Sequence, residues 1–299
     1  MGELNMGTSA QSSALWRSDA RSKISLFRLR SIVTTSLAAI LALVFIWPFF
    51  CIVGWTFNQI DAVMNPLIPI PAKFSTQFYQ LMFGETYHFQ DYILNSILVS
   101  FSTTVLSALA STLAGYALAK LKFPGRDLLF SIIIGIMLLP TATMLVPQFV
   151  VMKELNLVNN YWGLILPGVG GGAFGIFLMR QFMLGIPTEM LEAARMDGAN
   201  EFALFFRIVL PNAAAGIGVI ATLSLRGNWN ALLWPQLLIS DPERQLLMPA
   251  IVMQNNLMVG VFALPVVRTA SLVAAMVPLF LYAYSQRHFV STLAGAIKG

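Results

Sequence analysis

Long apolar stretches with almost no charge constrain this chain more than any other feature. A run of about 20 apolar residues can cross the hydrocarbon core of a bilayer as a helix. Six stretches are long enough: 32–57, 92–119, 128–152, 161–183, 212–235 and 265–286. Only 10% of the residues are charged, against about 25% in an ordinary soluble domain. The sequence therefore predicts an all-α integral membrane protein with six transmembrane helices.

The distribution of Lys and Arg predicts the orientation of these helices, because cytoplasmic flanks carry an excess of both. The residues on one side are Arg17, Arg21, Lys23, Arg28, Arg30, Lys120, Lys122, Arg126, Arg180, Arg195, Arg207, Arg287 and Lys298. Those on the other side are Lys73, Lys153 and Arg244. We expect both termini in the cytoplasm, with an arm over 1–31, a transmembrane domain over 32–286 and a tail over 287–299.

The predicted spans lack the residues that most chemistry inside a membrane needs. No Asp or Glu lies inside any of the six, whereas ion-coupled carriers usually place acids there. His88 and His288 fall on opposite sides of the predicted membrane, so neither a metal site nor a catalytic dyad is expected. Cys51 is the single cysteine and is expected to be a small buried hydrophobe. The net charge of +5 follows from the topology and does not indicate nucleic-acid binding.

A glycine-rich run, GVGGGAFG at 168–175, has two interpretations. A phosphate-binding loop would continue with Lys and then Ser or Thr, whereas Ile176 and Phe177 follow here. Close helix packing explains the run better, because its glycines share one helix face. These are Gly168, Gly172 and Gly175. With no recognisable ATP-binding motif, the chain is predicted to be a transport subunit without catalytic residues, driven by a partner.

One charged, helix-like segment interrupts the apolar sequence, over residues 184–211. Thr188 is a suitable N-cap for its first helix, and Asp197 with Gly198 would end that helix, since glycine adopts the left-handed conformation. Asn200 can cap a second short helix. The apolar residues of the second helix are Phe202, Phe205, Phe206 and Val209. We expect a helix–turn–helix at the cytoplasmic membrane surface.

The segment resembles the EAA loop of bacterial ABC importer permeases, with the pattern E-A-A, three residues, G, nine residues, I-x-L-P. The residues that fit this pattern without a gap are Glu192, Ala193, Ala194, Gly198, Ile208, Leu210 and Pro211. Other stretches resemble the oligosaccharide-importing subfamily: NSILVS at 95–100, GYALAKLKFPGR at 115–126, FGIFLMRQF at 174–182, NWNALLWP at 228–235 and QRHFVSTLAGAIKG at 286–299. More narrowly, they resemble the six-span partner of the maltose-type pair.

The resemblance implies a type I ABC importer permease fold in the inner, cytoplasmic membrane of a bacterium. A periplasmic or extracellular binding protein would deliver a saccharide to a heterodimer of this chain and a second homologous permease. Two copies of an ABC ATPase subunit would bind the ATP and Mg. The residues expected to couple to the ATPase are Glu192, Ala193, Ala194, Asp197, Gly198, Ile208, Leu210 and Pro211.

Within this expectation, Glu192 makes polar or ionic contacts with the ATPase, and the small Ala193 and Ala194 allow a close fit. An ordinary surface loop is the alternative. The C-terminal STLAGAIKG resembles a tail that reaches the ATPase dimer interface in some family members, and a plain solvated tail is the alternative. The outer loops 58–91 and 236–264 are expected to dock the binding protein.

One face of the fifth predicted span is the candidate substrate pathway. Its residues have the spacing of neighbours on a helix: Thr222, Arg226, Trp229, Asn230 and Trp234. Aromatic rings stack on sugars, Asn supplies a donor and an acceptor, and an arginine in a span usually faces a cavity or a partner. Alternatively, Arg226 pairs with an acid of the partner permease or reaches outward, and the tryptophans form an interface belt.

This face departs from the family pattern in its charge. An aromatic residue is common at the position of Arg226, and a polar or acidic residue often stands at that of Ala231. The added cation and the lost anion favour an acidic cargo, such as a uronate oligomer or a phosphorylated polyol. A permease for another small solute is one alternative function. A membrane-embedded lipid-modifying enzyme is another, which the missing acidic and histidine residues disfavour.

Overall fold

The computed structural model describes residues 7–59, 67–170, 172–257 and 263–296, and side chains within 30–59, 67–169, 172–254 and 264–283. The chain divides into two compact units, Met1–Thr76 and Gln77–Gly299. Regular structure in the described residues is helical, apart from an isolated antiparallel bridge between Asn58 and Phe74.

The first unit is built on one long helix, α1 (Gly7–Thr56). The predicted boundary between arm and span, at residue 31, lies inside this helix. Its apolar part from Arg30 to Thr56 is long enough to cross a membrane, as the sequence predicts for 32–57. The chain then turns back on itself, where the rings of Phe57 and Phe74 stack 5.4 Å apart. Residues 1–6 of the predicted arm lie outside the described part.

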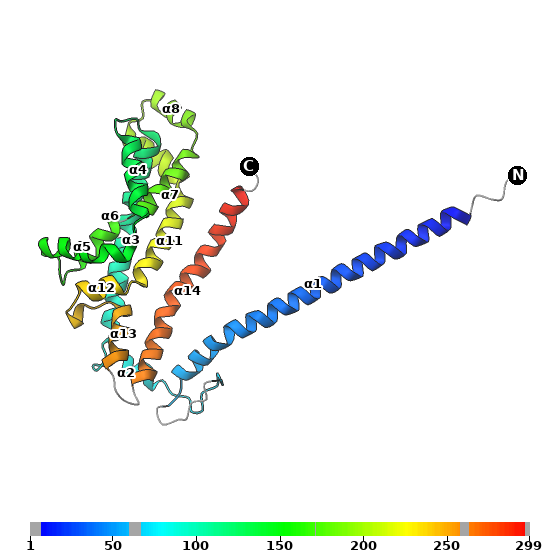
Figure 1. The fold of residues 1–299 in the computed structure, drawn as a ribbon, viewed down its shortest axis with the longest axis horizontal. Helices are drawn as coiled ribbons and strands as arrows, with labels where there is room; N and C mark the ends of the chain where they lie inside the picture. Colours follow the sequence, from blue (N-terminus) through cyan, green and yellow to red (C-terminus); the bar gives the residue numbers. More distant parts are fainter. Residues whose placement is uncertain (1–6, 60–66, 171, 258–262, 297–299) are drawn as a thin grey trace. The chain divides into compact units, whose positions relative to one another are not determined.

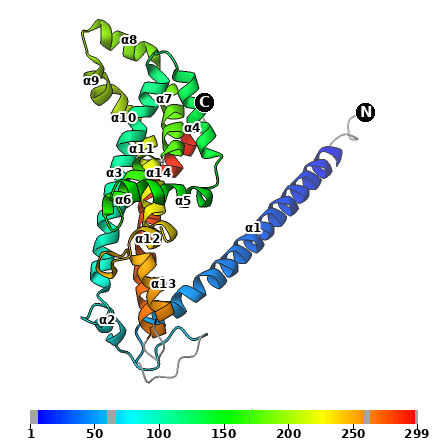
Figure 2. The ribbon, with the colours of Figure 1, turned by 60° about the vertical axis from the view of Figure 1, so that its left-hand side comes forward.

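The second unit is organised around α3 (Phe89–Lys120), which packs against α6 (Tyr161–Gly170), α7 (Ala173–Leu184) and α11 (Ala214–Trp229). Figures 1 and 2 show α3 running through the length of this unit. Its remaining helices are α2 (Gln77–Met82), α4 (Arg126–Met137), α5 (Thr141–Glu154), α8 (Thr188–Met196), α9 (Glu201–Leu204), the π-helix η1 (Phe205–Val209), α10 (Leu210–Asn212), α12 (Leu233–Leu238), the 3₁₀ helix η2 (Pro242–Arg244), α13 (Leu247–Leu257) and α14 (Ala263–Ala296).

The glycines predicted to pack closely do so against small hydroxyl side chains of α3. A Cβ atom added at Gly172 would lie 3.1 Å from the Ser111 hydroxyl oxygen. Cβ atoms added at Gly168 and Gly175 would be closer still, to Thr103 and Ser111 respectively. The packing interpretation of the glycine-rich run is therefore confirmed, because these positions leave no room for a side chain against α3.

The third predicted span is not one continuous helix, and that prediction is wrong. Helices α4 and α5 meet at an angle of 108°. Pro140 lies at this break, as the N-cap of α5 with φ −60° and ψ 128°. Proline has no N–H to continue the helix and keeps the preceding Leu139 out of the helical region. The apolar composition of residues 128–152 predicts a span, but composition alone does not reveal a break at a proline.

The fifth predicted span also differs, because α11 ends at Trp229 and α12 starts at Leu233. Pro235 explains the end, since in a continuous helix its ring would clash with the Ala231 carbonyl group. Before α11, the segment Glu201–Asn212 meets it at 73°. Within the described residues, four helices are long and apolar enough to cross a membrane, or up to six if each bent pair counts as one span.

The loop 236–264 is fastened to the rest of the second unit by polar contacts. The Asn159 side-chain oxygen accepts a hydrogen bond of 2.6 Å from the Ser240 N–H, and the Arg244 guanidinium donates to the Asn159 carbonyl oxygen at 2.9 Å. The Asn95 amide donates to the carbonyl oxygens of Glu243 and Gln245, both at 3.1 Å. This loop is therefore a fixed surface up to α13. Residues 258–262 of the loop and 297–299 of the tail lie outside the described part.

Candidate functional site

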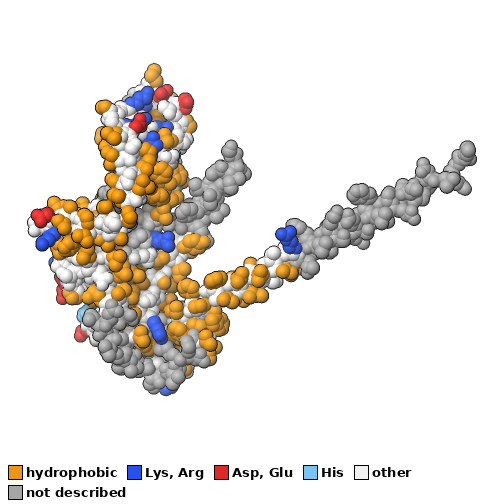
Figure 3. Space-filling view, viewed as in Figure 1, with side chains coloured by type: hydrophobic (Ala, Val, Ile, Leu, Met, Phe, Trp, Pro, Cys, Tyr) orange, Lys and Arg blue, Asp and Glu red, His pale blue; other side chains and the backbone are white. Residues whose placement is uncertain are grey.

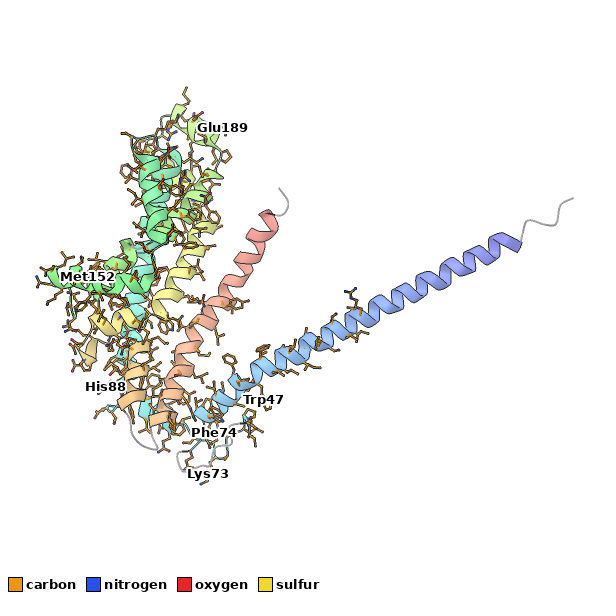
Figure 4. The ribbon with its side chains drawn as sticks, in the orientation of Figure 1. Trp47, Lys73, Phe74, His88, Met152 and Glu189 are labelled. Atoms are coloured by element: carbon orange, nitrogen blue, oxygen red, sulfur yellow. The ribbon has the colours of Figure 1, made fainter. Side chains whose placement is uncertain are left out.

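The EAA segment occupies one end of the second unit. Figure 4 labels Glu189 of α8 at that end and His88, which precedes α3, toward the other. Leu191 anchors α8 with only 1% of its surface exposed, in a cluster with Met183 of α7 and Leu204 of α9. On the other side of α8, Glu192 and Ala193 are exposed. The helix therefore presents Glu192 and Ala193 outward from a fixed base, whereas Ala194 is half-buried and packs against the cluster.

The turn after α8 has the conformation that its sequence predicts. Gly198 has a φ of +83°, a left-handed conformation that glycine adopts without steric cost. The N–H groups of Gly198 and Ala199 donate to the carbonyl oxygens of Arg195 and Ala194, both at 3.0 Å. Asn200 then caps α9, its side chain accepting from the Ala203 N–H at 2.8 Å. The glycine stop and the second cap are both confirmed.

The start of α8 differs by one position from the prediction. Pro187 is the N-cap, and no side chain caps the helix. Thr188 is instead the first helical residue, so its prediction as N-cap is wrong. The Lys120 ammonium group donates to the Ile186 carbonyl oxygen at 2.6 Å and to the Thr188 hydroxyl oxygen at 3.5 Å. A contact from another helix thus holds the entry to α8, which local sequence patterns do not reveal.

The second half of the loop is wound partly as the π-helix η1. Pro211 cannot donate to the Arg207 carbonyl oxygen as an α-helix would require, and such π-turns are frequent at functional sites. The four apolar residues predicted here divide into two pairs. Phe205 and Val209 are buried, whereas Phe202 and Phe206 are 77% and 58% exposed.

The last part of the EAA pattern lies at the entry to α11. Ile208 and Leu210 are half-buried and pack against the cluster beneath α8, and Pro211 is exposed. Asp197, the remaining predicted coupling residue, is exposed at the C-cap of α8.

A hydrogen-bonded group of three side chains joins the loop to α3, and the sequence did not indicate it. The Tyr116 hydroxyl donates to Glu201 Oε2 at 2.7 Å, and Arg195 Nε donates to Glu201 Oε1 at 2.9 Å. These two donors hold the pKa of the Glu201 carboxyl group below its ordinary value, the Arg195 bond contributing most. One carboxylate therefore connects α3, α8 and α9.

Of the five predicted pathway residues, Trp234 lies on another helix, α12, so the extension of the predicted face to Trp234 is wrong. Trp229 is 3% exposed, and its indole N–H donates to the Ala274 carbonyl oxygen of α14 at 3.0 Å. Trp234 lies on α12 and donates to the Gly163 carbonyl oxygen of α6 at 3.2 Å. Both tryptophans therefore hold helices together, and α11 ends before Trp234 is reached.

The other three pathway residues remain on one side of α11. Arg226 and Asn230 are exposed, and Thr222 is half-buried. The Asn230 amide donates to the Arg226 carbonyl oxygen at 2.9 Å, and the Thr222 hydroxyl donates to the Gly218 carbonyl oxygen at 2.8 Å.

Two further arginines lie in predicted spans. Arg180 of α7 donates to the Leu118 carbonyl oxygen at 3.3 Å and lies 3.9 Å above the Phe130 ring, so it joins α7 to α3 and α4. Arg268 of α14 is half-buried. No three His, Cys, Asp or Glu side chains gather as a metal site within the part of the chain that the structure describes.

Known proteins are similar to this chain in sequence and in fold. The family described as "Binding-protein-dependent transport system inner membrane component" matches residues 109–291. The arabinooligosaccharides transport system permease protein AraQ of Bacillus subtilis is 28% identical over 91% of this chain and 98% of its own length. The polygalacturonan/rhamnogalacturonan transport system permease protein YtcP of the same organism is 30% identical, over 86% and 94%. A bacterial ABC transporter involved in the import of the acidic polysaccharide alginate has the same fold, with a TM-score of 0.76 at 24% identity over 88% of this chain and 97% of that chain.

Proposed function

The chain belongs to the family of binding-protein-dependent transport system inner membrane components, and on that premise we propose that it carries an oligosaccharide across the inner membrane of a bacterium. One observation carries the proposal. Helix α8 presents Glu192 and Ala193 outward from a base that Leu191 and Gly198 fix, as a helix that docks on a partner must do. The relatives named for arabinooligosaccharides and for polygalacturonan/rhamnogalacturonan transport support a saccharide as the cargo.

The proposed topology has six crossings and both termini in the cytoplasm. The bent pair α4 and α5 counts as one crossing and α11 as another, with Glu201–Asn212 at the cytoplasmic surface, and the total equals the upper count of candidate spans. The excess of Lys and Arg lies on the side of α8, which the positive-inside rule places in the cytoplasm. The fixed loop 236–246 then faces outward, together with the loop 58–91, and these surfaces would receive the binding protein.

The proposed mechanism transmits ATP-driven closure of two ATPase subunits through α8 into the membrane helices. ATP and Mg are bound by those subunits, and this chain acts as a transport subunit beside a second homologous permease. Glu192 contacts the ATPase, while Ala193 and Ala194 allow a close approach. Movement of α8 passes to α3 through Glu201 and Lys120, which contact both parts.

The remaining predicted coupling residues are proposed to fix the geometry of the loop that carries α8. Gly198 with Asp197 makes the turn, and Ile208, Leu210 and Pro211 join the loop to α11. Of the predicted pathway, Thr222, Arg226 and Asn230 are proposed to face the cargo. Trp229 and Trp234 are proposed to support the helices that carry these residues, because both side chains are held by backbone carbonyl groups of neighbouring helices.

Purification of the complex tests this function. The chain should co-purify with an ATPase and a second permease, and its binding protein loaded with a saccharide should stimulate ATP hydrolysis and uptake. Glu192→Lys should uncouple hydrolysis from uptake or prevent ATPase assembly while the spans remain inserted. Normal uptake by this variant would contradict the proposal. Uptake of a phosphorylated polyol instead of any oligosaccharide would support the alternative of a permease for another small solute.

A further inference from the structure

Two phenylalanine side chains of the EAA segment are exposed although their neighbours along the chain are buried. Phe202 of α9 is 77% exposed, and Phe206 of η1 is 58% exposed. They are four residues apart, a spacing that puts both rings on one side of the helical segment Glu201–Asn212. Single exposed apolar residues are common on protein surfaces. Two large rings side by side instead indicate a surface that covers them.

Contacts on the other sides of the segment fix this orientation. Phe205 and Val209 are buried in the cluster beneath α8. The Phe206 ring meets the Phe205 ring edge-on, with centroids 5.2 Å apart. Glu201 accepts a hydrogen bond of 2.7 Å from Tyr116 of α3. The segment therefore cannot roll to bury its exposed rings without breaking these contacts.

The segment leaves the membrane part of the chain almost at a right angle. Glu201–Asn212 meets α11 at 73°, and α11 is one of the proposed crossings. Transmembrane helices tilt by about 20° from the bilayer normal on average, so the segment lies closer to the membrane plane than to the normal. Ala213 alone separates it from α11. The segment therefore begins where the apolar span ends.

The end of the second unit that carries α8 is layered. Figure 2 shows α9 and α10 between α8 and α11. Figure 3 shows charged side chains of both signs over the α8 end and many hydrophobic side chains along the helices below it. Helix α8, which presents Glu192 and Ala193 to a partner, thus lies beyond α9 and α10 as seen from α11. The two exposed rings belong to the layer at the boundary of the apolar surface.

The charge beside the two rings suits a phospholipid surface. Arg207 follows Phe206 and is exposed, and its long side chain can lie along apolar surface while the cation reaches phosphate groups. Glu201 is the single acid of residues 201–212, and Tyr116 and Arg195 hold its carboxylate. Aromatic residues are enriched at membrane–water interfaces, and the cytoplasmic leaflet attracts basic residues.

We propose that Phe202, Phe206 and Arg207 form an interfacial anchor on the phospholipids of the cytoplasmic leaflet. The two rings enter the boundary between headgroups and acyl chains, as the apolar faces of interfacial helices do, and Arg207 binds phosphate groups. The anchor keeps Glu201–Asn212 at the membrane while α8 moves with the ATPase. This inference rests on the proposed function in one respect, the cytoplasmic location of α8, and does not depend on the cargo. The alternative is that the ATPase covers the two rings.

Spin labels on the two ring positions distinguish lipid from protein as the covering surface. The test uses the complete complex in lipid bilayers, with a nitroxide on Phe202→Cys or Phe206→Cys and with Cys51, the only cysteine, replaced by Ser. Oxygen concentrates in the lipid and a nickel chelate stays in water, and both relax a nitroxide that they reach. Both labels should be relaxed more by oxygen than by the chelate. The control Ala193→Cys on α8 should be reached by the chelate and shielded from it when the ATPase binds.

Uptake by paired variants measures what the anchor contributes. Phe202→Ser with Phe206→Ser should lower uptake per ATP hydrolysed about tenfold, because burial of the two rings in lipid no longer favours the anchored position. Phe202→Trp with Phe206→Trp should keep most of the uptake, because fluid lipid accommodates a larger ring and Trp favours the interface. A fitted protein pocket would reject the Trp pair instead.

Three results would overturn the inference. The first is shielding of both labels from oxygen and chelate with the ATPase bound, followed by access of the chelate without it, which would make the ATPase the covering surface. The second is access of the chelate to both labels in the complete complex. The third is unchanged uptake per ATP in the Ser pair. The singly labelled variants decide the matter even where the Ser pair does not assemble. Failure of the proposed function is distinguishable, because no ATPase would then shield Ala193→Cys.

Discussion

The EAA segment (184–211) and helix α11 differ in how well short residue patterns predict their structure. In the loop, Gly198 and Asn200 do what their sequence predicts. In α11, the predicted face of pathway residues does not extend to Trp234, because the helix ends at Trp229. The conformation of the loop is set by caps and turns within a few residues. The burial and contacts of a side chain in a span depend instead on which neighbouring helix lies beside it. Local chemistry is readable from sequence, and tertiary contacts are not.

The largest effect is expected from a substitution in the packed interface between α3 and α7, where a neighbouring helix decides which side chain fits. A Cβ atom at Gly115 would lie 2.6 Å from Met179 Cβ and 3.0 Å from the Arg180 backbone nitrogen. Gly115→Leu should therefore abolish folded permease, because a packed helix interface has no room for the side chain. The measurement is the amount of monodisperse complex extracted from membranes. Gly135→Leu in α4, where nothing lies within 4 Å, is the control and should leave that amount unchanged.

The second prediction concerns Trp229. Its variants test whether the side chain holds helices together or stacks on a sugar. Trp229→Ala should cost about 3–5 kcal/mol of stability through the cavity it leaves. Trp229→Phe should cost about 1 kcal/mol through the lost hydrogen bond to Ala274. Thermal melting of the complex checks both, and the KM for uptake in Trp229→Phe should stay unchanged. A raised KM with an unchanged melting temperature in Trp229→Phe would indicate that Trp229 contacts the cargo.

The third prediction concerns Gly198, for which Gly125 is a matched control position. Both Gly198 and Gly125 have a φ of +83° and open space around a would-be Cβ. Valine at either position should cost a similar strain of about 1–3 kcal/mol. Gly198→Val should in addition reduce uptake per ATP hydrolysed, because the turn positions α8. Equal uptake per ATP in the two variants would contradict the assignment of Gly198 to coupling.

The smallest effect is expected at the contact between α3 and the loop. Tyr116→Phe removes one donor to Glu201, at a cost of about 1 kcal/mol, and should reduce uptake a few-fold with ATPase assembly intact. Glu201→Gln should act in the same direction. Because hydrogen bonds lower the pKa of Glu201, the contact is present at physiological pH and is lost only as the pH falls through that lowered value. Full uptake in both variants would show that the contact does not transmit movement.

The sequence predicted more of the fold class than of its details. Apolar stretches and the EAA spacing identified a helical permease, since both depend on composition and local order. Pro140 bends the third span by 108°, and a proline rule applied there would have found the break. No local rule would have found the contact of Glu201 with Tyr116, 85 residues apart, because it exists only after α3 and the loop have packed. The position of Arg268 within the predicted span 265–286, by contrast, is evident from the sequence alone.

Cysteine crosslinking at α8 tests the central claim most directly, that this helix is the surface on which the ATPase acts. Cys51 is the only cysteine and is buried, so Cys51→Ser should provide a silent background. A thiol-reactive crosslinker should join Ala193→Cys to the ATPase subunit, with a yield that changes when ATP binds. Lys122→Cys, at an exposed position between α3 and α4, should give no such ATP-dependent product. An ATPase that co-purifies but never crosslinks to Ala193→Cys, or that crosslinks equally to Lys122→Cys, would contradict the account.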